Sequence, residues 1–260
     1  MGPMSSPSRT AVLTGVGRRR GIAAAIAIGL ADDGWNLVLP VLPSYDERLG
    51  IGGGADEVRE VADAARGRGV QVVTVEADLA SAAAPSAILE AADTLGEPTA
   101  LVLSHSESVD SSILTTTVES WDRHFAVNAR AAWLLIRAMA ERLPVEPTTT
   151  PRARVVALTS DHTAHNLPYG ASKGALDRLV ITAAIELGDR GLRANVVNPG
   201  PIDTGWMSEE IRAAAIAQTP AGRIGTPQDT TDLIRFLLSD AGGWITGQRL
   251  FSSGGFHTSD

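Results

Sequence analysis

Short apolar runs alternate with longer amphipathic stretches along the whole chain. The short runs are bounded by glycine or polar residues, which is typical of buried strands, whereas apolar positions spaced three or four apart indicate helices. The runs predict strands at residues 11–14, 36–41, 71–75, 100–103, 154–159, 193–197 and 248–251. The longer stretches predict helices at residues 21–33, 55–66, 83–95, 119–143, 169–189 and 227–238, with Thr226 as N-cap of the last, and a weaker helix at 208–218.

This strict alternation predicts one parallel sheet, because a strand that re-enters a sheet in parallel needs a crossover, usually a helix. We therefore expect a doubly wound α/β fold of the Rossmann type, with three layers of helix, sheet and helix. No break in composition divides the 260 residues, so residues 10–260 are expected to form a single dinucleotide-binding and catalytic domain. Residues 1–9 are polar and resemble a disordered or tag-like N-terminus, and residues 43–54 and 144–151 are expected to be loops.

Composition narrows the classes of partner and compartment. A net charge of -8 gives no general attraction for phosphate backbones or anionic membranes, so neither nucleic acid nor a membrane is expected as a partner. The chain has no cysteine, which excludes disulfides and thiolate metal sites. It starts without the apolar segment of a signal peptide, and its longest uncharged apolar run, residues 21–31, is too short to span a bilayer. We therefore expect a cytoplasmic protein.

Two of the predicted helices are apolar on more than one side. Residues 121–143 and 169–187 carry large hydrophobic side chains that occupy more than one stripe of a helical wheel. Burial on two sides predicts a subunit interface, so we expect a homo-oligomer, either a dimer or a homotetramer. The alternative is a thicker core within one chain.

A glycine-rich turn follows the first predicted strand and opens the first predicted helix, where a Rossmann domain receives a pyrophosphate. Glycines permit close backbone approach, and the helix N-terminus supplies free N–H donors. A turn that is glycine-rich only for its geometry is the alternative. The residues of this turn expected to bind the cofactor are Gly15, Gly17, Arg18, Arg19, Arg20, Gly21 and Ile22.

The three consecutive arginines of this turn favour NADP over NAD, because one of them can pair with a ribose 2′-phosphate. The second predicted strand ends in Pro40, Val41 and Leu42, where an NAD enzyme usually carries an acidic residue. Asp46 follows only later, in the loop. The alternative is that the arginines are simply solvated.

Tyr169 and Lys173 stand four residues apart at the start of a predicted helix and therefore share one helical face. A nearby ammonium favours phenolate, so this spacing predicts that Lys173 lowers the pKa of Tyr169. Such a tyrosine can give a proton to a carbonyl oxygen or take one from an alcohol. The expected substrate is accordingly a small carbonyl compound or alcohol.

The chain resembles the short-chain dehydrogenase/reductases over nearly its whole length, from Val12 to Gly255. The matching features appear in the family's order. They are the glycine turn, Asp78-Leu79, Asn128, Ser160, Tyr169 with Lys173, Asn198-Pro199-Gly200 with Thr204, Arg223-Ile224-Gly225-Thr226-Pro227, Ile245-Thr246-Gly247 and Gly254-Gly255.

This resemblance implies roles for individual residues. The implied catalytic residues are Tyr169 as acid/base, Lys173 as its tuning group and as ligand of the nicotinamide ribose, Ser160 as donor to the substrate oxygen, and Asn128 as holder of a relay water. The implied cofactor contacts are Asp78 and Leu79 around the adenine, the backbone near Ser104, and Pro199, Gly200, Ile202 and Thr204 around the nicotinamide. Residues 203–220 would form a mobile lid over the substrate.

The sequence departs from the family pattern in three places. The glycine turn is longer than usual and ends Gly21-Ile22-Ala23, as in enoyl-acyl-carrier-protein reductases, although the tyrosine–lysine spacing matches the carbonyl-reducing members. Residues 103–106 replace the usual Asn-Asn-Ala-Gly after the fourth strand, which removes the usual asparagine bonds to the cofactor. The interval from Ser160 to Tyr169 is short, which implies either a larger, more open pocket or a damaged site.

Several other side chains of this region could meet the substrate. His105 follows the fourth strand, His162 and His165 lie in the short loop, and Trp206 and Met207 lie in the expected lid. For each, the alternative is a solvated or packing role, and no metal is expected at the histidines because no matching cluster of ligands exists.

The combined pattern favours an NADP-dependent reductase of a ketone, which can be a 3-oxoacyl thioester, similar to bacterial 3-oxoacyl-carrier-protein reductases. An enoyl reductase is favoured only by the glycine turn. A nucleotide-binding regulatory protein without turnover is favoured by residues 103–106 and by the short loop, but retention of Asn128, Ser160, Tyr169 and Lys173 argues against it.

Overall fold

The computed structural model describes residues 9–42, 44–45, 48, 53–205 and 207–256. Asp46 and Trp206 lie outside the described residues, as does most of the loop expected at 43–54. The described residues form a seven-stranded sheet in the order β3-β2-β1-β4-β5-β6-β7, in which every neighbouring pair is parallel. The strands are β1 (Arg9–Leu13), β2 (Trp35–Val41), β3 (Val72–Glu76), β4 (Pro98–Leu103), β5 (Ala153–Leu158), β6 (Leu192–Asn198) and β7 (Arg249–Phe251).

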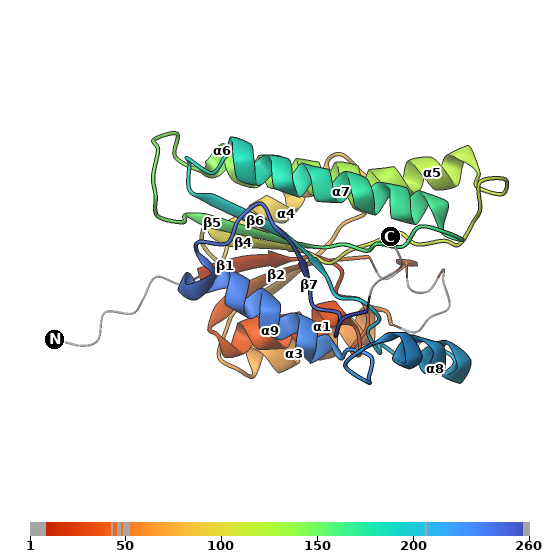
Figure 1. Cartoon of the computed structure of the whole chain (residues 1–260). Coiled ribbons are helices and arrows are strands. Elements are labelled where there is room, and N and C mark those ends of the chain that lie inside the picture. The colour runs from red at the N-terminus through yellow and green to blue at the C-terminus, as the bar shows by residue number, and fades with distance from the viewer. Residues whose placement is uncertain (1–8, 43, 46–47, 49–52, 206, 257–260) are drawn as a thin grey trace.

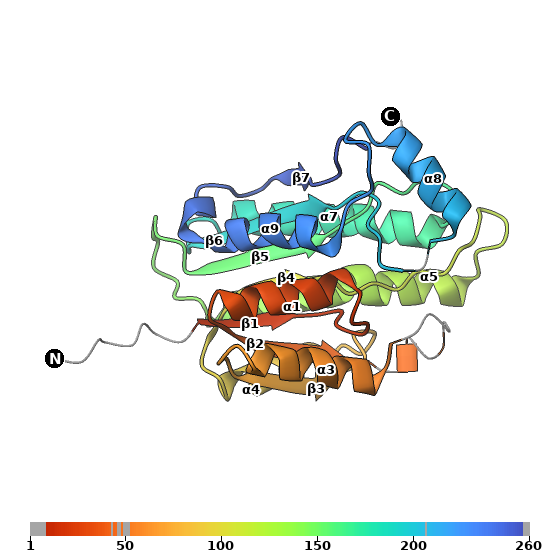
Figure 2. The same ribbon diagram turned by 90° about the horizontal axis from the view of Figure 1, so that it is seen from below.

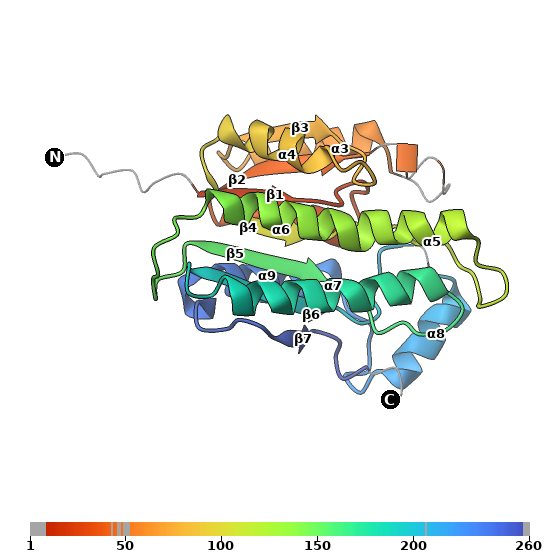
Figure 3. The ribbon, with the colours of Figure 1, turned by 90° about the horizontal axis from the view of Figure 1, so that it is seen from above.

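Helices cover both faces of the sheet and give the three expected layers (Figure 1). One face carries α1 (Ile22–Asp32), α3 (Ala55–Arg66) and α9 (Pro227–Leu238), which Figure 2 shows in front of the strands. The other face carries α4 (Ala84–Asp93), α5 (Val118–His124), α6 (Ala131–Arg142) and α7 (Leu167–Glu186), which Figure 3 shows in front. The doubly wound Rossmann-type fold expected from the alternating pattern is confirmed as a single domain.

Two hydrophobic cores hold these layers together, because alternate residues of each strand point to opposite faces of the sheet. In β5, for example, Val155 and Ala157 pack toward α6 and α7, whereas Val156 and Leu158 pack toward α1 and α9. The central strands are therefore apolar on both faces, as parallel strands covered by helices must be.

The prediction of one long α-helix at residues 119–143 is wrong in one respect. The middle of this stretch is a π-helical turn, Phe125–Arg130, which joins α5 to α6. Such a turn inserts an extra residue into an α-helix and often marks a functional position. Here it contains Asn128, whose amide bonds to the backbone beyond β4, a contact that lies outside any local helix pattern.

Most other predicted elements agree with the structure within a few residues. α9 begins at Pro227 and ends at Leu238, and Thr226 caps it in a reciprocal capping box with Asp229. The weaker helix at 208–218 is α8 (Glu209–Gln218), capped by Ser208. Among the described residues, no helix is both long and apolar enough to cross a membrane.

The sheet order places the site. The chain runs outward from β1 through β2 to β3 and then crosses back to β4 on the other side of β1. In such sheets a crevice opens beyond the carboxyl ends of the strands at this reversal, and ligands bind there. Most of the predicted site residues lie just after β1, β3, β4, β5 and β6 or in the first turns of α7, and Asn128 lies in the π-helical turn.

Candidate active site

Tyr169 and Lys173 occupy the first turns of α7, where Pro168 is the second helical residue and its missing N–H costs nothing. Lys173 is 3% exposed, and its Nζ donates to the carbonyl oxygens of Leu158 at 3.0 Å and of His105 at 3.5 Å. The same Nζ lies 5.8 Å from the centre of the Tyr169 ring. The structure therefore brings the predicted pair together and ties the lysine to the ends of β4 and β5.

Burial decides how the two groups titrate. It lowers the pKa of Lys173 to about 8, and the charge of Asp177 only partly opposes this effect. It also raises the pKa of Tyr169, an effect that the charge of Asp161 reinforces and a hydrogen bond with Ser160 opposes. The expectation that Lys173 lowers the tyrosine pKa is therefore wrong for the free chain, because the cost of burying a phenolate outweighs the neighbouring ammonium, which is turned toward backbone carbonyls.

Ser160 follows the last residues of β5 and lies at the side of Tyr169. Its hydroxyl accepts a hydrogen bond from the backbone N–H of His162 at 3.2 Å, and it lies close enough to the tyrosine side chain to oppose the rise in the pKa of Tyr169. The hydroxyl groups of Ser160 and Tyr169 thus form one polar surface at the carboxyl edge of the sheet. A carbonyl oxygen placed there could accept hydrogen bonds from both.

The short loop between Ser160 and Tyr169 is closely packed. A Cβ atom at Gly170 would lie only 2.1 Å from the carbonyl oxygen of His162, so this glycine lets the loop fold directly onto α7. Asn166, just before the helix, donates to Ser108 and Asp110 at 2.9 Å each. Backbone bonds of Ser111 with His165 and Leu167 then join the loop to the segment after β4.

Asn128 joins the π-helical turn to the same segment. Its Oδ1 accepts from the backbone N–H of Glu107 at 2.7 Å, and its Nδ2 donates to the Glu107 carbonyl at 2.9 Å and to the Ser172 hydroxyl at 2.8 Å. The amide therefore fixes the chain beyond β4 against α7, beside the tyrosine–lysine pair. Its role as holder of a relay water stays a prediction.

His105 stands in the segment that departs from the family pattern. It is buried, with Nδ1 2.7 Å from the Thr14 hydroxyl and Nε2 3.0 Å from the Val127 carbonyl. Burial and the charge of Lys173 lower its pKa to about 3, so the ring is neutral. Because a carbonyl can only accept, Nε2 donates to Val127 and Nδ1 accepts from Thr14. Of the two expectations for His105, the structure supports a packing role rather than contact with substrate.

The glycine turn approaches the end of β4 closely. Gly15 has φ +83°, and a Cβ atom there would lie 2.6 Å from backbone atoms of Ser104. Only glycine fits this approach. The turn then leads to the N-terminus of α1. Its N-cap residue is Gly21, so no side chain caps the first N–H groups of the helix. Free N–H groups at such a helix end suit a pyrophosphate.

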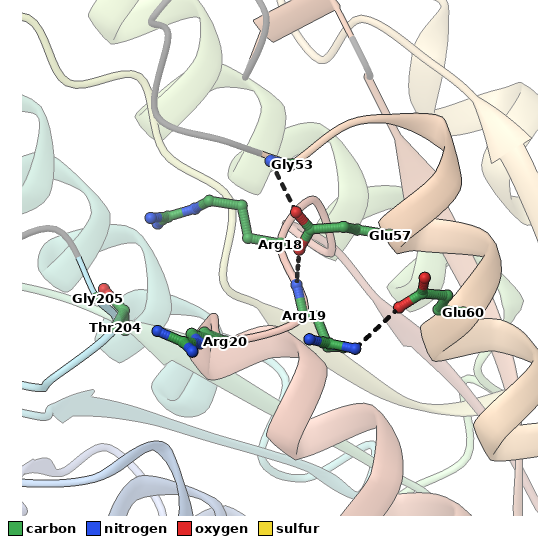
Figure 4. A pocket seen from close by; sticks show the side chains of 8 residues that line it. All are labelled: Arg18, Arg19, Arg20, Gly53, Glu57, Glu60, Thr204 and Gly205. Atoms are coloured by element: carbon green, nitrogen blue, oxygen red, sulfur yellow. Dashed lines mark hydrogen bonds and ion pairs between the residues drawn. The ribbon is translucent and has the colours of Figure 1, made fainter.

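The three arginines of the turn have different surroundings (Figure 4). The backbone N–H of Arg19 donates to Glu57 at 2.6 Å, and its guanidinium pairs with Glu60 at 3.3 Å. Arg18 and Arg20 extend to the other side, Arg20 toward Thr204 and Gly205. Together they border a cavity of about 440 Å³ lined by Arg18, Arg19, Arg20, Gly53, Glu57, Glu60, Thr204 and Gly205.

The expected adenine region contains a chain of charges that the sequence did not reveal. The carboxylate of Glu107 has 2% of its side-chain area exposed and accepts from Arg48 at 2.9 Å and from Arg123 at 3.0 Å. Arg123 also pairs with Asp78 at 3.3 Å. The carboxylate of Asp78 is therefore already paired with Arg123, and the neighbouring Leu79 is buried.

The segment beyond β6 carries the residues expected around the nicotinamide. The Asn198 side chain accepts from the backbone N–H of Gly200 at 3.0 Å, which shapes the turn at Pro199 and Gly200. Ile202 is buried and forms an isolated bridge with Gly225. Thr204 follows at the rim of the cavity.

The expected lid, residues 203–220, contains α8 and the segment that leads into it. Asp203 forms an ion pair with Arg212 of that helix. Met207 is half-buried at the start of the segment. Whether the segment moves or touches substrate stays a prediction.

The two histidines of the short loop, His162 and His165, are exposed. The centre of the His162 ring lies 6.3 Å from that of Tyr169. Within the described ranges, no three histidine or acidic side chains converge as a metal site would require.

Comparison with known proteins points in the same direction as this geometry. A family profile described as "Enoyl-(Acyl carrier protein) reductase" matches residues 15–257. An uncharacterized oxidoreductase of Bacillus subtilis, YjdA, is 33% identical over 96% of this chain and 98% of its own length. An NADPH-dependent aldehyde reductase-like protein of Arabidopsis thaliana is 31% identical over 98% of this chain and 96% of its own. The solved structure of an angucycline C-6 ketoreductase, LanV, with bound NADP superimposes with a TM-score of 0.82 at 26% identity, covering 95% of both chains.

Proposed function

The chain belongs to the short-chain dehydrogenase/reductase family, and from that premise we propose that it is an NADPH-dependent reductase of a ketone or aldehyde in which Tyr169 is the proton donor. The family acts with NAD(P) on alcohols and carbonyl compounds. One arrangement carries the finer proposal: Ser160 lies close enough to the Tyr169 side chain to influence its pKa, and the buried Lys173 lies one helical turn away.

The surroundings of Tyr169 support reduction rather than oxidation at neutral pH. Burial raises the pKa of the phenol, so the free chain holds Tyr169 in its protonated form. That is the form needed to give a proton to a carbonyl oxygen. Ser160 donates to the same oxygen and stabilises the negative charge that develops on it. The Lys173 ammonium then stabilises the phenolate that Tyr169 leaves behind.

The residues of the crevice fit a dinucleotide. Gly15 brings the turn against the end of β4, and the uncapped N-terminus of α1 offers donors to a pyrophosphate. The nicotinamide supplies the hydride when it is bound. Asp78, Leu79 and the backbone near Ser104 would hold the adenosine half, and Pro199, Gly200, Ile202 and Thr204 the nicotinamide half. Lys173 would also hold the nicotinamide ribose.

NADP is preferred over NAD in this proposal because of the arginine turn. The Arg19 guanidinium pairs with Glu60, and Arg18 and Arg20 extend to the other side of the turn; we assign the 2′-phosphate to Arg18 and Arg20 because of that placement. No acidic residue ends β2 to repel that phosphate. The proteins named above that carry NADPH or NADP in their descriptions support the same choice.

The substrate proposed first is a 3-oxoacyl thioester or a related ketone, and the assembly proposed is a homotetramer. Reduction of a carbon–carbon double bond is the second candidate, supported by the description of the matching family profile and by the long glycine turn. A regulatory protein without turnover is the third and is supported only by the altered segment after β4.

One set of measurements separates these candidates. Fluorescence titration with NADPH and NADH is followed by addition of ketones, 3-oxoacyl thioesters and enoyl thioesters, with absorbance reporting oxidation of the cofactor. We expect tighter binding of NADPH and turnover with a ketone. Turnover only with enoyl thioesters would favour the second candidate, and nucleotide binding without any turnover would favour the third.

The matched variant is Tyr169→Phe, which removes one oxygen atom and keeps the ring. We expect it to retain NADPH binding and to lose turnover by about a hundredfold or more, the usual contribution of a positioned general acid. Normal turnover in this variant would show that Tyr169 is not the proton donor.

A further inference from the structure

Lys173 is the only lysine of the chain. Of the 22 lysines and arginines, all the others are arginines. Arginine stays charged at every relevant pH, whereas a buried lysine can lose its proton. The single lysine also stands where a cation is costly, because its side chain is 3% exposed. Its two hydrogen-bond acceptors, the carbonyls of Leu158 and His105, are dipoles without formal charge.

Asp177 lies one helical turn beyond Lys173 on α7, so the two side chains share a face of the helix. Its side chain is 14% exposed, and its Oδ2 lies 3.5 Å from Nε of Arg249 on β7. Its Oδ1 is buried and has no hydrogen-bond partner of good geometry in the described part of the chain, and neither has the neighbouring Thr159 hydroxyl at the end of β5. The carboxylate therefore lies on the helical face of Lys173, farther than the 4.0 Å of a direct ion pair, with only one of its oxygens engaged.

We propose that the Asp177 carboxylate is the counter-charge that keeps the Lys173 ammonium charged inside the site, which makes Asp177 a positioning residue for the reaction. The effect of Asp177 on the reaction rests on the proposed function, whereas the placement of Asp177 relative to Lys173 does not. Tyr169, Lys173 and Asp177 follow one another at intervals of four residues along one helix, so they form a line from the reacting edge into the protein.

The other groups that face Lys173 cannot play this part. His105, at the end of β4, is neutral because its pKa is lowered to about 3. Tyr169 is protonated in the free chain, since its pKa is raised. Arg249 is itself a cation, and it pairs with Asp177. Among the described residues, Asp177 is the acid whose charge opposes the effect of burial on the pKa of Lys173.

The competing explanation is that Asp177 only anchors Arg249 and so joins α7 to β7. The two explanations differ in what the lysine does when each partner is removed. Loss of the carboxylate lowers the pKa of Lys173 if Asp177 is its counter-charge. Loss of Arg249 leaves the carboxylate in place and does not lower it.

The composition of the chain makes a direct measurement possible. Protein grown with isotope-labelled lysine gives a single ε-CH₂ resonance, that of Lys173, and its chemical shift titrates with the side chain. We expect Asp177→Asn to lower the pKa of Lys173 by about one unit or more, as removal of a close opposite charge does. Arg249→Gln and Glu186→Gln, which removes an exposed acid from the end of the same helix, serve as matched controls and are expected not to lower it.

An unchanged Lys173 titration in Asp177→Asn would overturn the proposal, and so would an equal fall in Arg249→Gln. If Asp177→Asn fails to fold, the wild-type protein still decides. Its Lys173 resonance should show a second, smaller inflection at acidic pH as Asp177 takes up a proton, and the absence of that inflection would overturn the proposal as well.

Activity supplies the functional readout and separates this inference from the proposed function. In Asp177→Asn, the alkaline limb of the pH profile of kcat/KM should move to lower pH together with the lysine titration, and Asp177→Glu should restore it. If the wild-type protein turns over but the alkaline limb of Asp177→Asn stays where it is in the wild type, the inference is contradicted and the proposed function is not. Absence of turnover in the wild type would contradict the proposed function, while the lysine titration could still be read.

Discussion

At the scale of single residues, the main feature of the site is a cation held where it is costly. Lys173 is buried, and burial lowers its pKa from 10.5 to about 8. The unfolded chain therefore binds this proton more tightly than the folded chain does between those values. By linkage, the cost to stability is largest below about pH 8 and disappears as the pH rises toward 10.5.

Replacing Lys173 by Met should separate stability from activity. Methionine keeps the length of the side chain and removes the buried charge, so we expect the variant to be more stable at pH 7 by about 1–3 kcal/mol and to lose turnover. Urea unfolding at pH 7 and at pH 10 measures the difference, which should shrink at the higher pH. A less stable variant at pH 7 would mean that the contacts of the ammonium outweigh its burial.

The placement of Tyr169 and Lys173 on one helix could be predicted from the sequence, but their titration could not. The four-residue spacing of Tyr169 and Lys173 placed both on one face of a helix, and the structure places both there. The direction of the tyrosine pKa depends on burial by segments far away in the chain, which no local pattern reveals. Asp177 could have been found by extending the same spacing one turn further. Glu107 could not, because its arginine partners come from two distant segments.

At the scale of elements, the strands and helices followed from hydrophobic periodicity, and their deviations occur where distant segments meet. The π-helical turn at Phe125–Arg130 contains Asn128, which bonds to a segment about twenty residues earlier. The end of β4, where the usual asparagines are absent, is held by His105. Its ring joins Thr14 after β1 to Val127 in the π-helical turn, so one side chain connects three elements.

Replacing His105 by Ala should loosen this junction in a pH-dependent way. At pH 7 we expect a loss of about 1–3 kcal/mol in the free energy of unfolding, because the Thr14 hydroxyl and the Val127 carbonyl lose a buried partner. In the wild type, the folded histidine stays neutral down to about pH 3, whereas the unfolded one gains a proton near 6.5. Wild-type stability therefore falls as the pH drops through this window. Urea unfolding at pH 7 and pH 5 should show a smaller gap between variant and wild type at pH 5, and an equal gap would show that His105 is not held neutral.

At the scale of the whole molecule, the fold follows from the alternation of strands and helices, which is visible in one sequence. The reversal of strand order then marks the edge of the sheet where the candidate site lies. The outer surface of the layer formed by α5, α6 and α7 is a different case. Two helices of this layer were expected to be buried on two sides, and the second side would be covered by another subunit, which a single chain does not contain. In the isolated chain, Trp121 is 37% exposed, Trp133 46% and Ile185 77%. These residues lie on the helices that cover one face of the sheet (Figure 3).

Large apolar side chains exposed on neighbouring helices of one layer are typical of a surface that another subunit covers. We therefore expect Trp133→Glu to weaken self-association, because a carboxylate would have to be desolvated at the interface. Sedimentation velocity or light scattering over a range of protein concentrations measures the change in mass. Val145→Glu, which alters an exposed apolar residue of the loop after α6, is the matched control and should leave the assembly intact. A wild-type protein that is monomeric at every concentration would show that this surface serves another purpose, and equal effects of the two variants would place the interface elsewhere.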